Sequence, residues 1–232
     1  MEKELENKIK VLYKTDSEAV VYKPAGIATQ LSNDIKGTSL EAVLKKLLHK
    51  ENIYFPHRLD RITSGLILIA FDPKTVNFYN DEIKSKKFDK YYIARIETKL
   101  EYTECLLGTH KRYIKVEGKI SRIVKRGGMV SFLDILAIEK TPKHPGCYHV
   151  LIRLITGRMH QIRVMLSDIG IPLCGDHLYN PESKSKHFYL ESIILSFEDT
   201  GKIERTIFYD DNPDRDVFSA EMNRKIESIA SE

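Results

Sequence analysis

The chain has 232 residues, 42% of them hydrophobic, so it is long enough to bury a sizeable core as one large domain or two small ones. It contains no run of about 18 apolar residues, and its charged start is unlike a signal peptide, which argues against a helical membrane protein and predicts a soluble, intracellular one. The net charge is +4, but residues 203–232 hold eight acids and four bases, so they carry −4 and residues 1–202 carry +8, which suits a polyanionic partner.

Three cysteines, Cys105, Cys147 and Cys174, lie far apart in the sequence. They show neither the paired CxxC spacing of a zinc site nor the even number of a disulfide scaffold. We expect reduced core residues and no metal site.

The first predicted element is a β-hairpin. β-Branched and aromatic runs at 9–13 and 19–22 are separated by the turn-like Thr15-Asp16-Ser17, and Pro24 and Gly26 end the second strand. Fewer than ten residues precede the first of these strands, so we expect no separate N-terminal module.

A helix is predicted next. Thr38-Ser39-Leu40-Glu41 has the form of a capping box, which marks the start of a helix. Apolar residues follow at helical spacing through about His49, namely Leu40, Val43, Leu44, Leu47 and Leu48.

The stretch 57–65, His-Arg-Leu-Asp-Arg-Ile-Thr-Ser-Gly, places Asp60 between Arg58 and Arg61. Fixed positive charges favour an ionised carboxylate, so Asp60 is expected to be ready to act as a nucleophile or a base. The apolar run 65–71 predicts a buried strand, which would fix the Asp60 loop to the core. A surface ion-pair patch is the alternative interpretation. A kinase catalytic loop is excluded, because it lacks the intervening Leu59 and needs Gly-rich and Asp-Phe-Gly motifs that are missing here.

Asp72-Pro73 predicts the start of a second helix, with an N-cap acid before a proline at the first helical position. This helix is expected to reach about Ser85, with Val76, Tyr79 and Ile83 inward. A strand is predicted over 88–96, in which the adjacent Tyr91 and Tyr92 face opposite sides and therefore different environments.

The second half of the chain is predicted to consist mainly of strands. Short alternating strands over 113–140 surround Gly127-Gly128, and another strand covers 148–155. A helix is expected from about Arg158 to Ile169, with Gly170 as its C-terminal stop. Its apolar arc would hold Met159, Ile162, Leu166 and Ile169, with Arg163 just outside it. Strands near 188–197 and 203–208 and a helix to about Ile229 complete an α+β pattern with three or four helices and mainly antiparallel strands.

Four segments of the chain match one known set of motifs in the same order. Residues 21–26 resemble a Lys-Pro-x-Gly element, 57–65 match an HRLDxxTSG signature at every fixed position, and 90–94 resemble a Lys-x-Tyr-x-Ala strand. The last motif is resembled by Thr-Gly-Arg-Met-His-Gln-Ile-Arg at 156–163, followed by Gly170-Ile171-Pro172 and Gly175-Asp176-x-x-Tyr179. Over nearly all of its length the chain therefore resembles the RluA family of RNA pseudouridine synthases.

The resemblance implies roles for individual residues. Asp60 is the catalytic aspartate, Arg163 its basic partner and Tyr92 the tyrosine that stacks on the target base. Arg58 corresponds to the arginine that enters the RNA stack as the uridine leaves it. The further residues expected at the RNA are Arg61, Lys23, Arg158, His160 and Lys90. Taken singly, Arg163 could instead form a structural salt bridge and Tyr92 could be a core residue.

The resemblance also implies an architecture and a partner. The fold would be a mixed, mainly antiparallel sheet with flanking helices and loops around a central cleft. Residues 1–232 would form a single catalytic domain without the S4-type RNA-binding module that many members carry. The implied partner is tRNA or large-subunit rRNA, no cofactor is used, and a cytoplasmic monomer is expected.

The chain departs from the family pattern at three places. Met159 replaces a usual Thr, Met165 stands where His is common, and Leu190-Glu191-Ser192 stands where Leu-His-Ala is usual. None of these changes touches Asp60, Tyr92 or Arg163, so they bear on substrate contacts. Candidates for phosphate contacts, or for a merely solvated face, are Lys84, Lys86, Lys87, Lys111, Arg112, Lys125 and Arg126.

Two other functions are set against the isomerase. An inactive RNA-binding or ribosome-assembly protein would keep the fold, but binding alone would tolerate Asn in place of Asp60. A base-excising glycosidase normally needs two carboxylates about 5–9.5 Å apart, and no second acid accompanies Asp60 in its motif.

Overall fold

The computed structural model describes the chain except residues 1, 32–37, 99–103, 213 and 232. The chain divides into two compact units, which are described separately. Unit 1 comprises Met1–Asp89 and Glu191–Asp211, and unit 2 comprises Lys90–Leu190 and Asn212–Glu232.

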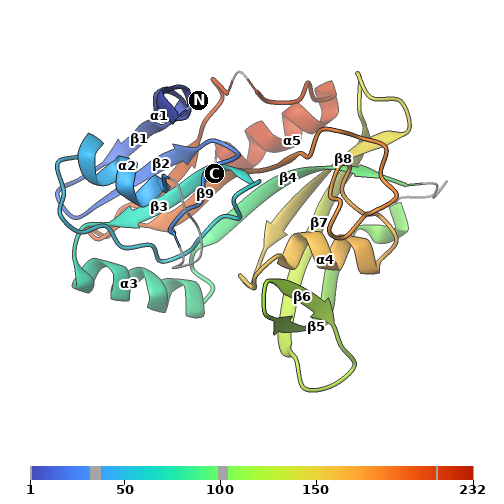
Figure 1. Ribbon diagram of the computed structural model, residues 1–232, viewed down its shortest axis with the longest axis horizontal. Coiled ribbons are helices and arrows are strands. Elements are labelled where there is room, and N and C mark those ends of the chain that lie inside the picture. Colours follow the sequence, from blue (N-terminus) through green and yellow to red (C-terminus); the bar gives the residue numbers. More distant parts are fainter. Residues whose placement is uncertain (1, 32–37, 99–103, 213, 232) are drawn as a thin grey trace. The chain divides into compact units, whose positions relative to one another are not determined.

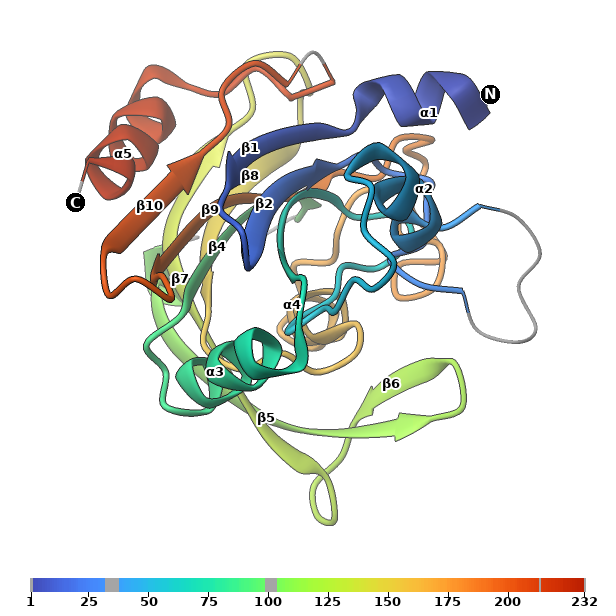
Figure 2. The ribbon, with the colours of Figure 1, turned by 90° about the vertical axis from the view of Figure 1, so that its left-hand side faces the viewer.

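Unit 1 holds a sheet with helices around it (Figure 1). Its elements are α1 Glu2–Lys8, β1 Lys10–Lys14, β2 Glu18–Lys23, α2 Leu40–Leu47, β3 Ser64–Ala70, α3 Pro73–Lys84, β9 Leu190–Glu198 and β10 Glu204–Phe208. The predicted hairpin is confirmed, because β1 and β2 pair antiparallel; β2–β3 and β9–β10 also pair antiparallel, whereas β3–β9 is parallel. Figure 2 shows β10 running along β9.

One core cluster of unit 1 lies between the sheet and α3. Tyr79 is fully buried, as its helical spacing predicted, and packs edge-on against Phe88 and Phe197, whose rings stack 5.3 Å apart. The complete cluster is Val20, Leu66, Leu68, Tyr79, Phe88, Leu195 and Phe197. The N-cap of α3 is Asp72, which accepts from the Thr75 amide as expected.

Three helical details of unit 1 differ from the sequence-based expectation. The cap of α2 is Ser39, one residue after the predicted Thr38, and Ser39 Oγ accepts from the Ala42 amide. The helix ends at Leu47, with Leu48 as its C-cap, shortly before the expected His49. Leu47 is 50% exposed, although its spacing predicted an inward position. Helix α1 was not predicted, because its charged sequence has no apolar periodicity.

Unit 2 is built on an antiparallel sheet of order β4-β8-β7-β5-β6. Its elements are β4 Asp89–Glu97, the 3-10 helix η1 Glu104–Leu106, β5 Gly108–Glu117, β6 Ile120–Ile123, β7 Met129–Lys140, β8 Cys147–Leu154, α4 Gln161–Asp168 and α5 Ala220–Ala230. β7 spans 12 residues with a bulge between Ile135 and Ala137, so a single long strand replaces some of the short strands expected here.

Helix α4 corrects the predicted amphipathic arc. It begins at Gln161 instead of Arg158, because His160 occupies the N-cap position in the left-handed region, with φ 54°. Residues 161–166 are all buried, Arg163 among them at 5% exposed, so α4 has no solvent-facing edge there. Gly170 ends the helix as predicted, with φ +83°.

The cysteine prediction holds for two of the three residues. Cys174 is buried and Cys147 is partly buried, and their Sγ atoms lie 3.4 Å apart as free thiols. Burial raises the pKa of Cys174, which keeps its thiol protonated. Cys105, expected in the core, is exposed.

The predicted α+β class with mixed, mainly antiparallel pairing is confirmed. Among the described helices, none combines the length and the apolar character needed to cross a membrane.

Gly65 tests the packing of the parallel β3–β9 pair. A Cβ at this position would lie 2.2 Å from the Ser192 carbonyl oxygen, and Gly65 has φ +117°. Gly65→Ala should therefore lower the free energy of unfolding by about 3 kcal/mol or more, measured with urea. The matched control is Gly118→Ala, which has φ +61° but nothing within 4 Å and should cost about 1–2 kcal/mol. Equal losses would contradict the close approach of the two strands.

Candidate functional site

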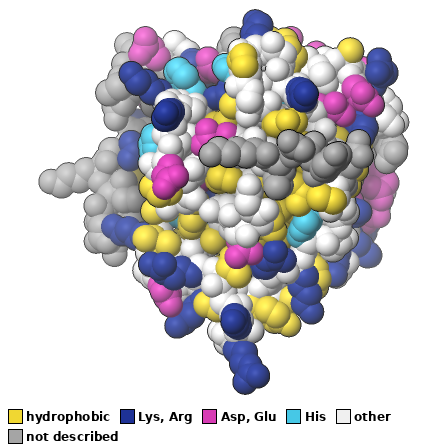
Figure 3. Space-filling model, turned by 90° about the vertical axis from the view of Figure 1, so that its right-hand side faces the viewer, with side chains coloured by type: hydrophobic (Ala, Val, Ile, Leu, Met, Phe, Trp, Pro, Cys, Tyr) yellow, Lys and Arg dark blue, Asp and Glu magenta, His cyan; other side chains and the backbone are white. Residues whose placement is uncertain are grey.

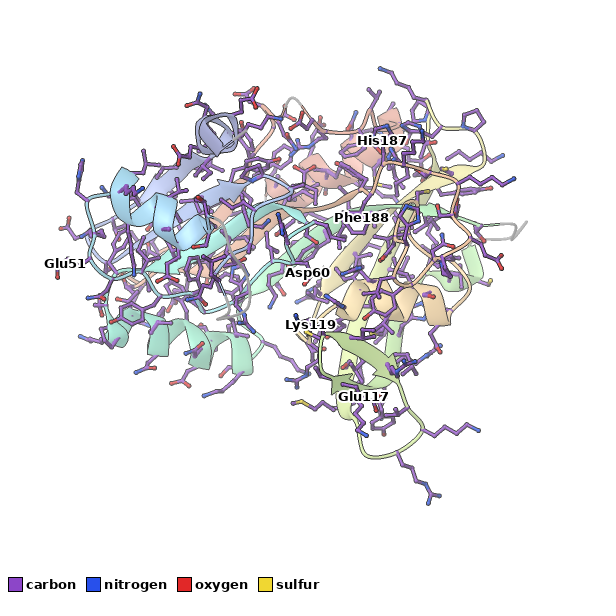
Figure 4. All side chains as sticks on the ribbon, viewed as in Figure 1. Glu51, Asp60, Glu117, Lys119, His187 and Phe188 are labelled. Atoms are coloured by element: carbon purple, nitrogen blue, oxygen red, sulfur yellow. The ribbon has the colours of Figure 1, made fainter. Side chains whose placement is uncertain are left out.

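Asp60 lies on the loop that leads into β3 (Figure 4). Its side chain is half-buried, the flanking Arg58 and Arg61 are exposed, and Leu59 is buried. The Asp60 carbonyl accepts from the Thr63 amide at 3.1 Å, which closes a turn over the aspartate.

The N-terminal side of Asp60 is fixed by Thr29. Thr29 Oγ1 donates to the Leu59 carbonyl at 2.8 Å and accepts a hydrogen bond from the Leu59 amide at 3.3 Å. Thr29 is 4% exposed, so water competes little for these bonds. No local sequence pattern points to this residue, because its partner lies 30 positions away.

The C-terminal side of Asp60 is fixed by the loop after β2. The Gly26 amide donates to the Arg61 carbonyl at 2.7 Å, and Arg61 Nε donates to the Gly26 carbonyl at 2.8 Å. Gly26 has φ +96°, a conformation that glycine adopts without steric cost. Both neighbours of Asp60 are therefore held through the main chain.

Lys23 is buried behind this loop instead of facing a ligand. Its ammonium donates to the carbonyls of Pro24 at 3.1 Å, Ile27 at 2.9 Å and Arg61 at 3.4 Å. Burial lowers the pKa of Lys23 to about 7, against the opposing effect of the Asp60 charge. Lys23 therefore supports the Asp60 loop from inside, and we remove it from the expected RNA contacts.

His57 also has a structural task. Its Nε2 accepts from the Leu68 amide of β3 at 3.1 Å, and its ring packs 5.5 Å from that of Phe88.

In unit 2, β4 supplies Tyr92 and Lys90. Tyr92 is 4% exposed and lies opposite Ile152 of β8, whereas the adjacent Tyr91 is more exposed, so the predicted difference in their environments is confirmed. Lys90, expected at the RNA, is 3% exposed, and its Nζ lies near Gly157 in the loop before α4. We therefore remove Lys90 from the surface contacts as well.

Arg163 forms a buried bidentate pair with Asp176. Nε and Nη2 donate to the two carboxylate oxygens, each at 2.8 Å, and the guanidinium carbon lies 5.1 Å from the Tyr179 ring centroid and 5.7 Å from that of Phe188. Such a fork fixes both the position and the plane of a guanidinium. Asp176 was not predicted as a site residue, although it stands within the last motif.

The loop before α4 is held by Gln161. Its Oε1 accepts from the Arg158 amide at 3.0 Å and from Thr156 Oγ1 at 2.8 Å, and its Nε2 donates to the Phe132 carbonyl at 2.9 Å. The Arg158 side chain is half-buried, and its Nε has no hydrogen-bond partner among the described residues.

His160 contacts the protein through Tyr179. Its Nδ1 lies 2.9 Å from the Tyr179 hydroxyl, which also accepts from the Ser121 amide of β6 at 2.9 Å. His160 is therefore tied to Tyr179, and its expected contact with RNA stays a prediction.

The predicted site residues thus form two groups, one in each unit, whose positions are fixed by the bonds described above. In unit 1, Asp60 lies with Arg61 and Lys23; in unit 2, Arg163 lies with Asp176, Tyr179 and Phe188. A fixed carboxylate can attack carbon or remove a proton, and a fixed guanidinium can hold an anion. The pairing of Asp60 with Arg163 stays a prediction.

Comparisons with known proteins include residues of both groups. The family model for RNA pseudouridylate synthase matches residues 18–168, which include Asp60, Tyr92 and Arg163. The ribosomal large subunit pseudouridine synthase C of Rickettsia bellii (strain RML369-C) is 29% identical over 212 residues, covering 83% of this chain and 65% of that protein. The mitochondrial tRNA pseudouridine(32) synthase of Saccharomyces cerevisiae is 26% identical over 205 residues, covering 84% of this chain and 43% of that protein.

The fold has a counterpart among solved structures. Human RNA Pseudouridylate Synthase Domain Containing 4 superposes with a TM-score of 0.69 at 20% identity, covering 90% of each chain. The present chain thus spans less than two thirds of the length of both curated relatives named above, while its fold matches a solved structure over most of its length.

The buried ammonium of Lys23 makes stability depend on pH in a defined direction. Its pKa is lowered from 10.5 to about 7 in the folded chain, so between these values the unfolded chain binds a proton that the folded chain does not. The free energy of unfolding should therefore rise with pH, by up to about 1.4 kcal/mol per pH unit from Lys23. Urea unfolding of wild type and Lys23→Met at about pH 7, 8 and 9 measures this as a growing difference. A constant difference would contradict it.

Removal of the Asp176 charge should destabilise unit 2. Asp176→Asn keeps the side-chain shape but withdraws the carboxylate from Arg163, and losing one partner of a buried ion pair costs about 3–5 kcal/mol. The control is Asp168→Asn, whose pair with Arg112 has side chains 34% and 32% exposed and should cost about 0–1 kcal/mol. Similar urea midpoints for the two variants would refute the importance of the buried pair.

Proposed function

The chain belongs to the RNA pseudouridylate synthase family, and from this we propose that it converts specific uridines of tRNA or large-subunit rRNA into pseudouridine. The observation that carries the proposal is the HRLDRITSG loop, in which the residues on both sides of Asp60 are held by hydrogen bonds to Thr29 and Gly26. The name of one relative specifies ribosomal RNA and that of another tRNA, so both substrate classes are included.

The proposed reaction breaks the N1–C1′ bond of uridine, turns the uracil and joins C5 to C1′. The hydrogen on C5 leaves as a proton and the freed N1 takes up a proton, so the product is an isomer of uridine and no external reactant is consumed. The protein must supply an anionic group near the sugar and a closed pocket that retains the freed base. Asp60 serves either as the nucleophile at C1′ or as the base that removes the 2′-hydrogen.

Arg163 is proposed as the partner of Asp60. A guanidinium has five N–H donors, and Asp176 accepts two of those on Arg163. Because Asp176 fixes the plane of the group, Arg163 can direct further donors at a second carboxylate without reorganisation. Such a donor would keep Asp60 ionised and aimed at the sugar.

Tyr92 and Arg58 are proposed to manage the extruded base. Removing a base from its stack costs a few kcal/mol, and stacking on an aromatic ring returns about 1–3 kcal/mol. Tyr92 offers that ring inside the protein, and the exposed Arg58 can enter the space that the uridine leaves. Arg61, Arg158 and His160 remain proposed contacts near the RNA.

The proposal also includes the working form of the protein. Residues 1–232 would act as one catalytic domain and as a monomer, in the cytoplasm and without a cofactor. The central cleft implied by the family resemblance is part of the same proposal.

Release of tritium from RNA labelled at uridine C5 tests the reaction, because only isomerisation displaces that hydrogen. The chain should release tritium from unmodified tRNA or large-subunit rRNA, and Asp60→Asn should lower the rate by more than about 100-fold. The control is Asp81→Asn, on the exposed Asp81–Lys84 pair of α3, which should retain the rate.

Three outcomes would contradict the proposal. Absence of release from any cellular RNA would favour an inactive RNA-binding protein. Release that is unchanged by Asp60→Asn would remove the aspartate mechanism. Free uracil among the products would favour a glycosidase.

A further inference from the structure

The positive charge of the chain is concentrated in one segment of unit 2, the arm, which we define as residues 108–132 (β5, β6 and the start of β7). The arm holds seven bases and one acid, so it carries +6, against +4 for the whole chain; all other residues together carry −2. The bases are Lys111, Arg112, Lys115, Lys119, Arg122, Lys125 and Arg126. Figure 3 shows Lys and Arg side chains gathered at the lower end of the visible face.

One face of the arm is used for packing. Ile114 and Ser121 are each 1% exposed, and Ser121 Oγ donates to the Met159 carbonyl in the loop before α4. Arg112 pairs with Asp168 of α4 at 2.5 Å. This inward face therefore attaches the arm to α4.

The outward face of the arm has a different composition. Side chains alternate along a strand, so Lys111, Tyr113 and Lys115 of β5 share the face opposite Ile114. The register adds their cross-strand partners, Phe132, Val130 and Arg122. Tyr113 is 40% and Val130 38% exposed, and Lys111 Nζ lies 5.5 Å from the Tyr113 ring centroid.

Packing of the arm does not explain this face. Its acid, Glu117, lies 3.2 Å from both Lys115 and Arg122 and cannot neutralise the rest. Lys119, Lys125 and Arg126, at the two turns of the arm, are exposed and have no acidic partner among the described residues. Figure 4 places Lys119 beside Glu117 at the first of these turns.

We propose that the outward face of the arm binds a single strand of the substrate RNA outside the target nucleotide, with Tyr113 stacking on an unpaired base and the arm lysines and arginines contacting phosphates. An aromatic ring set among cations is the arrangement that holds single-stranded nucleic acid, since the ring takes a base face and the cations take the backbone. The identity of the strand as substrate rests on the proposed function; the binding itself does not.

Binding of fluorescent RNA to the full chain, followed by anisotropy over a range of salt concentrations, tests the cations. The probe is a single-stranded RNA of about 20 nucleotides and mixed sequence. In Lys119→Gln/Lys125→Gln/Arg126→Gln the slope of log affinity against log salt should become shallower by about 2, since each phosphate contact contributes about 0.7. The control Lys140→Gln/Lys143→Gln/Arg224→Gln removes the same charge from exposed positions of unit 2 outside the arm. Equal slopes in the two triple variants would overturn the proposal.

Tyr113 tests the stacking. Tyr113→Ala should lower the affinity for the single strand about 5- to 150-fold. It should leave the affinity for a duplex of about 20 base pairs unchanged. Tyr113→Phe keeps the ring and should retain the affinity for the single strand. Equal binding by all three proteins, or equal loss on both RNAs, would overturn the stacking role. These measurements need no turnover, so they separate the two proposals. A shallower slope in the arm variant together with no tritium release by the wild type would support RNA binding by the arm and contradict the proposed isomerase activity.

Discussion

A carboxylate can serve as a nucleophile or base only where its backbone is held still, and in this chain that constraint is met by a small set of bonds between two loops of unit 1. Thr29 forms two hydrogen bonds with the main chain of Leu59, and Gly26 forms two with Arg61. The buried ammonium of Lys23 donates to three carbonyls of the same two loops. Charged ammonium groups are costly to bury. The hydrogen bonds that Lys23 donates to the loop therefore offset the cost of removing its ammonium from water. The geometry around Asp60 depends on that balance.

Unit 2 applies the same logic to a cation. Arg163 is buried, yet its charge is matched by Asp176 and its guanidinium lies near two aromatic rings. A guanidinium fixed in this way loses little conformational entropy when it meets an anion, because its rotamer is already selected. The left-handed backbone at His160 belongs to the same arrangement, since it sets the direction in which α4 starts.

Local chemistry made much of the fold predictable. Asp72 before Pro73, the Thr15–Ser17 turn and Gly170 each act within a few residues, and the structure places a cap, a hairpin and a helix end at those points. Burial is set by tertiary contacts, which explains the errors. Lys23 and Lys90 were expected to contact RNA but are enclosed by residues distant in sequence. Arg163 was expected just outside the apolar arc of its helix but is buried. Asp176 and Thr29 were missed as site residues because their tasks depend on partners 13 and 30 positions away.

The bonds that secure Asp60 have one property with an evolutionary consequence. At residues 26 and 59 these hydrogen bonds use only the main-chain amide and carbonyl groups. The side chain of residue 59 therefore takes no part in them. A reactive loop anchored in this manner depends little on which apolar side chain stands at residue 59, whereas residue 26, with φ +96°, stays restricted to glycine. New recognition surfaces can therefore arise beside the acid while its placement is inherited unchanged.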